Sequence, residues 1–446
     1  MPAPDSLVAR LGRLIREAQA EKHLPSVAAA ALRDGEIVWS DSVGLADVEG
    51  AEDATPDHQY RIASITKTFT AVAVMQLRDE GKLSLDDPLD RHIAGAGHSP
   101  TVRAILGHAS GLQREPPGRI WDTLTFPSRD ELVGGLADSE QVLPSGAYRH
   151  YSNLGFALLG EVVARVSGSD YERYVDDRVI KPLGLRRTTW RPAPPVATGY
   201  FVDPWTDTAA REPVTEGRAT AAAGELWSTA PDLCRWAAFL TDPVEEVLSR
   251  DTVDEMHAFQ TMTDLERWTV GHGLALMLMR KGDRVFSGHS GAHLGFLSNV
   301  AAHRPTRTAA AVVTNSSSGV AITALGIELA DAVADLWPAE PRVWRPGKDL
   351  PAELEGVLGA WWSEGVEFLF RYRDGRLEAV VRDAGAAEEL THFARDGEDL
   401  YRAVDGLERG ELLRIVRDGS GAVSRLEVAG YPFERRPQSM AKPPSG

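Results

Sequence analysis

Strand-forming stretches lie at both ends of the first 340 residues, and their separation restricts the fold more than any other feature of the sequence. Residues 26–32 and 36–39 are apolar and flank Asp34-Gly35, a dipeptide typical of tight β-hairpins. Residues 284–314 contain three further apolar stretches joined by glycine-bearing turns. The long segment between the two ends reads largely as helix. We therefore expect an α/β fold of the α+β kind, in which both ends complete one antiparallel sheet, helices flank it and a helical insert joins them.

The sequence pattern changes after residue 340. Residues 341–349, which include Trp344-Arg345-Pro346-Gly347, read as a linker between a first domain of residues 1–340 and a second of residues 350–436. In the second domain, short alternating strands are separated by Asp-Gly pairs such as Asp374-Gly375, which predicts a small β-barrel or sandwich. Residues 437–446 are expected to form a disordered tail.

Composition and charge exclude several classes of function. The 446 residues include 48 Lys and Arg against 65 Asp and Glu, a formal charge of −17, which argues against nucleic acid or an anionic membrane as a partner. The single cysteine, Cys234, excludes an internal disulfide, and we expect no metal and no cofactor. A small molecule or a short peptide remains as the expected substrate, and the oligomeric state stays open.

The N-terminal segment reads as an amphipathic helix and not as a signal peptide. Leu7, Leu11, Leu14 and Ile15 recur at helical spacing, with charged residues between them. The segment has no unbroken apolar stretch before a small-residue cleavage site, and no run of about 18 apolar residues occurs in the sequence. We therefore expect a cytoplasmic protein.

Ser64 and Lys67 form a candidate nucleophile and base. Three residues apart at the start of a long apolar helix, they share one helix face, where an amine can reach a hydroxyl. A lysine that is desolvated against apolar surface can take the proton of a serine hydroxyl at neutral pH. This spacing alone occurs by chance in most chains of this length, so the hypothesis needs partners elsewhere in the sequence.

Two other stretches supply such partners, namely Tyr151-Ser152-Asn153 and His289-Ser290-Gly291. Together with Ser64-Ile65-Thr66-Lys67, they resemble, in order and separation, the three motifs of the penicillin-binding protein and class C β-lactamase family of serine hydrolases. The resemblance spans roughly residues 10 to 335, and residues 106–112 and 223–229 resemble further signatures of that family. It implies a β-lactamase-like fold for the first domain.

The resemblance also implies a role for each motif. Ser64 would be acylated, Lys67 would help to remove its proton, and Tyr151 would carry a proton to the leaving group, either as a phenolate stabilised by Lys67 or as a phenol. Asn153 would bind the substrate amide. The remaining implied roles are a cleft wall at His289, a close approach of substrate at Gly291, and an oxyanion hole made by the backbone N–H groups of Ser64 and Ala292.

His289 departs from the pattern of many β-lactamases and penicillin-binding proteins, which carry a lysine there. A histidine is mostly neutral at pH 7, so recognition of an anionic β-lactam is expected to be weaker. We therefore predict a serine hydrolase that acts on an ester or amide, either an esterase or a D-amino-acid-type peptidase. The alternative is an acyltransferase or peptide-cyclising thioesterase that passes the acyl group to an amine. A true β-lactamase ranks behind both, and an inactive binding module is the non-enzyme alternative.

The residues permit two rival site hypotheses. Gly288-His289-Ser290-Gly291-Ala292 could be a defective nucleophile elbow with Ser290 as the nucleophile, although the final glycine and a following helix are missing. His289 and His293 could form a metal pair if they lay four residues apart on a helix, but the glycines around them disfavour a helix. His108 reads as a packed structural histidine.

The second domain resembles the lipocalin-like β domain that is appended to some hydrolases of this family.

Overall fold

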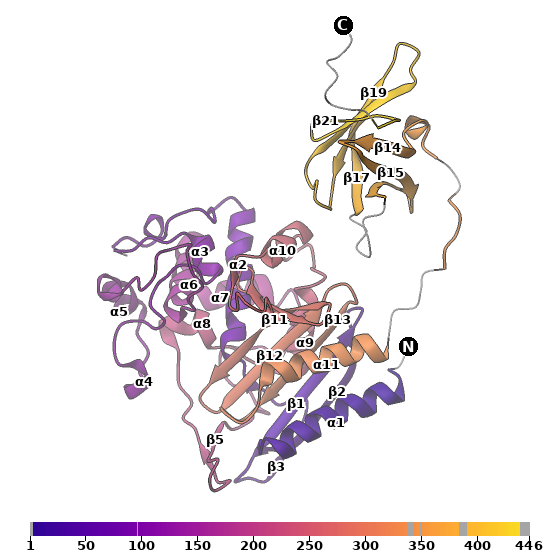
Figure 1. Ribbon diagram of the computed structural model, residues 1–446. Helices are drawn as coiled ribbons and strands as arrows, with labels where there is room; N and C mark the ends of the chain where they lie inside the picture. The colour runs from indigo at the N-terminus through magenta and orange to yellow at the C-terminus, as the bar shows by residue number, and fades with distance from the viewer. Residues whose placement is uncertain (1–2, 96, 338–342, 348–349, 383–389, 438–446) are drawn as a thin grey trace. The chain divides into compact units, whose positions relative to one another are not determined.

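The computed structural model describes residues 3–95, 97–337, 343–347, 350–382 and 390–437 (Figure 1). The chain divides into two units, Met1–Glu340 and Pro341–Gly446, and each has its own hydrophobic core. Within the expected linker, residues 343–347 form neither helix nor strand. The expected tail, apart from Pro437, lies outside the described residues.

The first unit is built on one antiparallel sheet that joins the two ends of its chain, as the sequence predicted. Its strand order is β3-β2-β1-β13-β12-β11-β10-β9-β8, and Ala30 of β1 pairs with Ala311 of β13. The strands are β1 (Ser26–Arg33), β2 (Glu36–Asp47), β3 (Glu52–Asp53), β8 (Thr261–Met262), β9 (Val270–His272), β10 (Met277–Lys281), β11 (Arg284–His293), β12 (Phe296–His303) and β13 (Thr308–Thr314).

Both faces of this sheet are covered, which explains the run of small apolar residues in β1. Successive side chains of a strand point to opposite faces. Ala28 and Ala30 belong to the core on the side of α2 (Thr66–Asp79) and α9 (Ala230–Phe239). Ala29 and Ala31 pack on the side of α1 and α11, which lie together on the sheet in Figure 1. These two helices span α1 (Asp5–Glu21) and α11 (Ile322–Leu336).

The expected helical insert lies between β3 and β8. Its longest helix, α6 (Asn153–Ser167), begins where the Ser152 side chain accepts a hydrogen bond from the Gly155 N–H (2.9 Å), and it ends at Gly168, whose φ is 71°. The shorter helices are α3 (Val102–Leu106), α4 (Ile120–Thr123), α5 (Arg129–Gly134), α7 (Tyr171–Val175), α8 (Ala221–Gly224) and α10 (Arg250–His257). Two small antiparallel pairs join this region, β4 (Tyr60–Arg61) with β7 (Trp227–Ser228) and β5 (Tyr200–Val202) with β6 (Ala209–Arg211).

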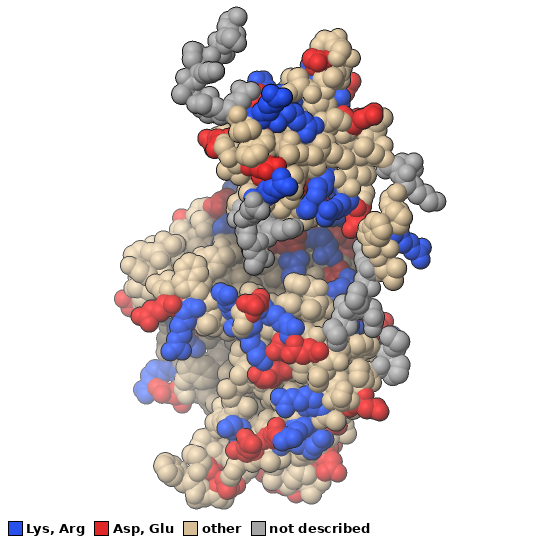
Figure 2. All heavy atoms as spheres, turned by 45° about the vertical axis from the view of Figure 1, so that its right-hand side comes forward, with Lys and Arg blue, Asp and Glu red and all other residues tan. Residues whose placement is uncertain are grey.

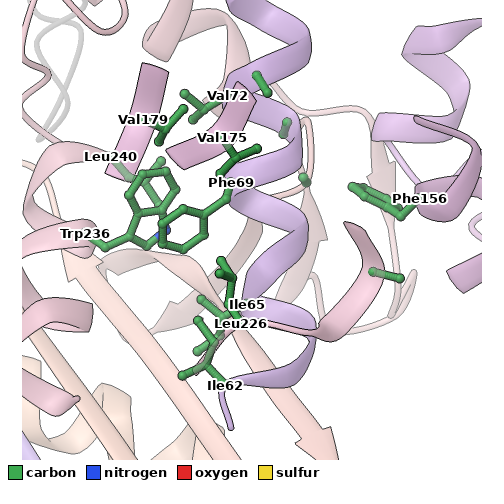
Figure 3. Close-up of a cluster of buried hydrophobic side chains, with 14 of the residues drawn as sticks. Ile62, Ile65, Phe69, Val72, Phe156, Val175, Val179, Leu226, Trp236 and Leu240 are labelled. Carbon is green, nitrogen blue, oxygen red and sulfur yellow. The ribbon is translucent and has the colours of Figure 1, made fainter. Parts of the chain in front are cut away.

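Helix α2 is held rigidly in the core. The ring of Phe69 stacks on Trp236 of α9 at a centroid distance of 3.6 Å, and Figure 3 shows Val72 of α2 and Ile65, which directly precedes α2, in the same cluster. The Trp236 indole donates a hydrogen bond to Thr68 Oγ1 (2.8 Å). A helix fixed in this way presents its first turn in one orientation, which a reactive side chain requires.

The second unit is an eight-stranded antiparallel sheet that curls into a small, nearly closed barrel. Its strands pair in sequence order, and Trp362 of the first strand exchanges backbone hydrogen bonds of 2.7 and 2.9 Å with Glu434, which follows the last. The strands are β14 (Gly359–Ser363), β15 (Val366–Arg373), β16 (Arg376–Val381), β17 (Leu390–Gly397), β18 (Leu400–Ala403), β19 (Leu412–Arg417), β20 (Val423–Val428) and β21 (Tyr431–Phe433). Near-closure of the sheet reduces its exposed edges.

The surface carries both signs of charge. On the face shown in Figure 2, Lys and Arg side chains are interspersed with Asp and Glu side chains. Within the described part of the chain, no helix has the length and apolar character that crossing a membrane requires.

Candidate active site

Ser64 lies in a strained turn that is anchored to the sheet. The turn, Ala63–Ile65, precedes α2, and Ala63 has a φ of 46°, in the left-handed region that costs a non-glycine residue about 1 kcal/mol or more. The Ile62 carbonyl accepts a hydrogen bond from Ser298 Oγ (2.9 Å). At Gly291 a Cβ atom would lie only 2.0 Å from that same carbonyl oxygen. The glycine therefore lets the turn that bears Ser64 lie close against β11. The sequence had suggested instead that Gly291 makes room for the substrate.

Lys67 is fully buried, and its ammonium group has three acceptors. Nζ donates to Ser64 Oγ (3.1 Å), to Asn153 Oδ1 (2.7 Å) and to the Ala223 carbonyl (2.6 Å). Burial lowers the pKa of Lys67 to about 7. A neutral amine can keep the bonds to Asn153 and Ala223 and direct its lone pair at the hydroxyl of Ser64.

Tyr151 stands beside Ser64 within a ring of cations. Lys67 Nζ lies 4.9 Å from its ring centroid, and the guanidinium carbons of Arg114 and Arg149 lie at 5.1 and 5.9 Å. Burial raises the pKa of Tyr151 to about 12, although a hydrogen bond with Ser64 and the two arginines act in the opposite direction. The side chain is therefore a phenol at neutral pH.

Asn153 is oriented by a chain of hydrogen bonds that ends at a carboxylate. Its Oδ1 accepts from Lys67, and its Nδ2 donates to Glu115 Oε1 (2.6 Å). Glu115 raises the pKa of Lys67 and Arg114 lowers it, although burial outweighs both. Because an amide carries two N–H donors, Asn153 retains one for a substrate.

His289 lies on β11 beside Tyr151, with ring centroids 6.5 Å apart. Burial, and secondly the charge of Lys67, lower the pKa of His289 to about 3, so the ring is neutral. Nδ1 donates to the Ser290 carbonyl (2.6 Å), which makes Nε2 the acceptor nitrogen. That buried Nε2 has no hydrogen-bond partner among the described residues. The site therefore offers an acceptor where a lysine would offer a charged donor.

A small cavity of about 60 Å³ opens beside Ser64 and Ala292, and Asn153 and Glu115 line it too. Its opposite wall consists of aromatic rings in mutual contact at centroid distances of 5.9 to 6.4 Å, namely Trp121, Phe126 and His293. Burial lowers the pKa of His293 to about 3, so this wall is uncharged. The fold thus collects all the residues that the three motifs predicted around one region.

The rival hypotheses find no such support. Ser290 Oγ hydrogen-bonds with Thr323 of α11 and accepts from Asn299 Nδ2 (3.1 Å), so it faces the helix that covers the far side of the sheet. It lies within a strand and not in a strand-turn-helix elbow. His289 and His293 occupy positions four apart on that strand, which separates their Cα atoms by about 13 Å, too far to share one ion.

The sequence had singled out residues 106–112 without assigning them roles at the site. His108, from that stretch, stacks on Tyr151 at a centroid distance of 4.3 Å and is buried, in accordance with the packed structural role expected for it. Arg149 donates to His272 Nε2 (2.8 Å), which places a guanidinium group behind the phenol. No sequence signal distinguished Arg149 or His272 from other residues of their types.

Residues 223–229 also contribute a buried ion pair. Glu225 accepts from Arg61 Nη2 (2.7 Å), and each side chain is 3% exposed. Arg61 Nη1 further donates to the Thr215 carbonyl (2.9 Å), and Glu225 accepts from the Gly217 N–H (2.7 Å). This pair fixes the segment that carries Ala223, the acceptor of Lys67, to the strand that precedes Ser64.

Comparison with known proteins agrees with this architecture. A family model described as Beta-lactamase matches residues 11–335, and one described as Domain of unknown function (DUF7586) matches residues 350–435. Beta-lactamase-like protein 2 of Dictyostelium discoideum is 32% identical over 258 residues, which is 54% of this chain and 47% of that protein. The D-alanyl-D-alanine-carboxypeptidase/endopeptidase AmpH of Escherichia coli (strain K12) is 30% identical over 189 residues, 40% of this chain and 48% of that protein. The chain thus spans about half the length of these relatives.

Solved structures resemble one or both units. The octameric penicillin-binding protein homologue from Pyrococcus abyssi has a TM-score of 0.67 at 24% identity, covering 96% of this chain and 99% of its own, and shows the fold alone. A D-stereospecific amidohydrolase from Streptomyces sp. has a TM-score of 0.63 at 29% identity, covering 73% of this chain and 98% of its own. D-amino acid amidase from Ochrobactrum anthropi SV3, complexed with D-phenylalanine, has a TM-score of 0.64 at 26% identity, with coverage of 74% and 99%.

The family match covers well over half of the chain and includes all three motif segments. The chain belongs to the beta-lactamase family, whose members are serine hydrolases.

Proposed function

We propose that this protein hydrolyses amides of amino acids with a free amino group and an aromatic side chain, through an acyl-enzyme on Ser64, with a preference for the D-configuration. The observation that carries the proposal is the position of Lys67. Its Nζ is fully buried 3.1 Å from Ser64 Oγ, and its pKa is lowered to about 7. About half of the lysine is therefore neutral at pH 7 and available as a base.

The acylation step follows from the hydrogen bonds at the site. Neutral Lys67 takes the proton of Ser64, Oγ attacks the substrate carbonyl carbon, and the backbone N–H groups of Ser64 and Ala292 hold the oxyanion. The carbon–nitrogen bond then breaks as the phenol of Tyr151 gives its proton to the leaving nitrogen, and the proton held by Lys67 returns to Tyr151. The high pKa of Tyr151 favours this relay over a phenolate base. A water molecule then attacks the acyl-enzyme with the same proton transfers, and the carboxylic acid product leaves Ser64.

The cavity beside Ser64 supports the substrate class. Two carboxylates line the cavity, and Glu225 is already paired with Arg61, so Glu115 is the one that could receive an α-ammonium group. The aromatic wall of Trp121, Phe126 and His293 suits an aromatic side chain. The neutral His289 offers an acceptor for an N–H group and no positive charge for a carboxylate, which disfavours β-lactams. The likeness to a D-stereospecific amidohydrolase and a D-amino acid amidase supports the stereochemical preference.

The test combines active-site labelling with turnover. A fluorophosphonate probe should label the wild type and the Ser290→Ala variant but not Ser64→Ala, as read by intact mass. Label that persists in Ser64→Ala and disappears in Ser290→Ala would overturn the nucleophile assignment.

A substrate panel addresses the class. D-phenylalanine amide should be hydrolysed faster than its L-enantiomer, than N-acetyl-D-phenylalanine amide and than nitrocefin. Equal rates for the free and acetylated amides would contradict the role of Glu115, and rapid nitrocefin turnover would contradict the substrate class. Adding an amine to the same assay measures acyl transfer, the alternative fate of the acyl-enzyme.

A further inference from the structure

The C-terminal barrel contains a cavity of about 330 Å³, and its lining identifies it as the barrel lumen. Lining residues recur at every second position of a strand, as in Phe368 and Phe370 of β15 and in Ala379 and Val381 of β16. Alternate residues of a strand face one side of the sheet, so these side chains point into the barrel and not onto its outer surface.

The inner end of the lumen is aromatic and buried. Phe370, Phe393 and Phe433 are between 1% and 6% exposed, and Phe370 contacts the other two rings at centroid distances of 6.2 and 5.9 Å. Trp361 belongs to the same core, is fully buried and donates its indole N–H to the Val357 carbonyl (2.6 Å). Protein interiors are normally packed without voids of this size, whereas ligand pockets begin at about 300 Å³.

The mouth of the lumen is apolar with a negative rim. Leu407 is 79% exposed and Tyr431 is half exposed, although both line the cavity. Among the described residues, two charged side chains line it and both are acidic, Glu364 in the turn between β14 and β15 and Glu408 between β18 and β19. Neither carboxylate has an ion-pair partner among the residues that the structure describes.

We propose that this lumen binds a small amine with an aromatic or aliphatic body, with the body in the lumen and the ammonium group at the rim between Glu364 and Glu408. The aromatic walls give an apolar body a large contact area and favour aromatic rings in edge or offset geometry. The two unpaired carboxylates attract a cation and repel a carboxylate, which selects against fatty acids. All the residues that line the site belong to the second unit.

The test compares three probes with the same apolar body, 4-phenylbutylamine, 4-phenylbutanol and 4-phenylbutyrate. Their affinities are measured by isothermal titration calorimetry on the full chain. We expect the amine to bind most tightly and the acid about tenfold more weakly, with a difference that shrinks as salt is added. An acid that binds as tightly as the amine, or the absence of binding by all three probes, would overturn the proposal.

Two variants locate the site. Ala379→Phe fills the lumen and should abolish binding of the amine, while persistent binding would place it elsewhere and overturn the assignment. Because that variant enlarges a side chain of the barrel core and could disturb folding, the double change of Glu364→Gln and Glu408→Gln serves as a second test at exposed positions. It should remove the preference for the amine over the alcohol and leave the affinity for the alcohol unchanged. A preference that survives would contradict the role of the rim.

Discussion

The cavity beside Ser64 and the lumen of the C-terminal barrel are constructed in opposite ways. The first has about 60 Å³ of space, and the side chains around it hold one another through short polar contacts, from Lys67 through Asn153 to Glu115. The second has about 330 Å³ and aromatic walls, and the charged side chains among its described lining residues lie at its rim. Buried charges that are paired can be tuned for chemistry, whereas an apolar lumen can hold a molecule but has no base to activate a nucleophile.

Removing the buried amine should produce the largest effect, because it breaks the polar network of the first cavity. Lys67→Met keeps the length of the side chain and removes the base, so kcat should fall by about 10³-fold, equivalent to about 4 kcal/mol. Steady-state hydrolysis of D-phenylalanine amide measures the change. Lys82→Met, at an exposed lysine, is the control and should behave as wild type. A Lys67→Met enzyme with wild-type turnover would exclude the lysine as the base.

A matched pair of core truncations tests whether the two units unfold separately. Leu159 of the first unit and Leu413 of the second are both fully buried in different cores, so each change to Ala should cost about 3 kcal/mol. Differential scanning calorimetry should show two transitions, with Leu159→Ala lowering one and Leu413→Ala the other. A single transition that both variants lower equally would show that the units unfold together.

Replacing His289 by lysine should reverse the preference of the site around Ser64 and Tyr151 for uncharged or cationic groups. The ammonium of His289→Lys would supply the positive charge that the neutral ring lacks, and acylation by nitrocefin should become about tenfold faster. His289→Gln, which supplies an uncharged side chain, is the control and should produce no such gain. Stopped-flow measurement of the rate of acylation by nitrocefin distinguishes the two variants. An unchanged rate in His289→Lys would mean that another residue determines the poor recognition of carboxylates.

The smallest effects concern the pH profile. Because the base must be neutral, kcat/KM should fall about tenfold per pH unit below the Lys67 pKa of about 7. Glu115→Gln removes a charge that raises this pKa and should move the acidic limb to lower pH, whereas Arg114→Gln should move it to higher pH. p-Nitrophenyl acetate, which has no amino group, is the substrate for this measurement. If the acidic limb of the pH profile moved in the same direction in both variants, a group other than Lys67 would be responsible for it.

The same lysine links pH to stability. Its pKa is lowered on folding from an ordinary value of 10.5, so between about pH 7 and pH 10.5 the unfolded chain binds the additional proton. This contribution to the free energy of unfolding therefore increases with pH across that window, and Lys67→Met should abolish it.

Local patterns were sufficient to predict the main elements. The Asp34-Gly35 turn specified the first hairpin, and the strands between residues 284 and 314 lie where their apolar stretches indicated. The nearly closed barrel of the second unit follows the alternation and turns of its sequence. These features depend on residues that are close in the chain, so they can be predicted from local sequence patterns.

Contacts between distant segments were not predictable in this way. Glu115 reaches Asn153 across 38 residues, and Arg149 reaches His272 across 123. The neutral state of His289 depends on burial, and the constraint on Gly291 comes from the carbonyl of Ile62, which no local pattern relates to it.

The sequence by itself determined which residues could react, because Ser64 and Lys67 share one helical turn and the other two motifs stand in a recognisable order. The tertiary structure decided how they are charged. Burial against α8 and the neighbouring strand lowers the pKa of Lys67, raises that of Tyr151 and leaves His289 as a neutral acceptor. Protonation depends on desolvation and on charges brought from remote parts of the chain, and these exist only once the fold has formed.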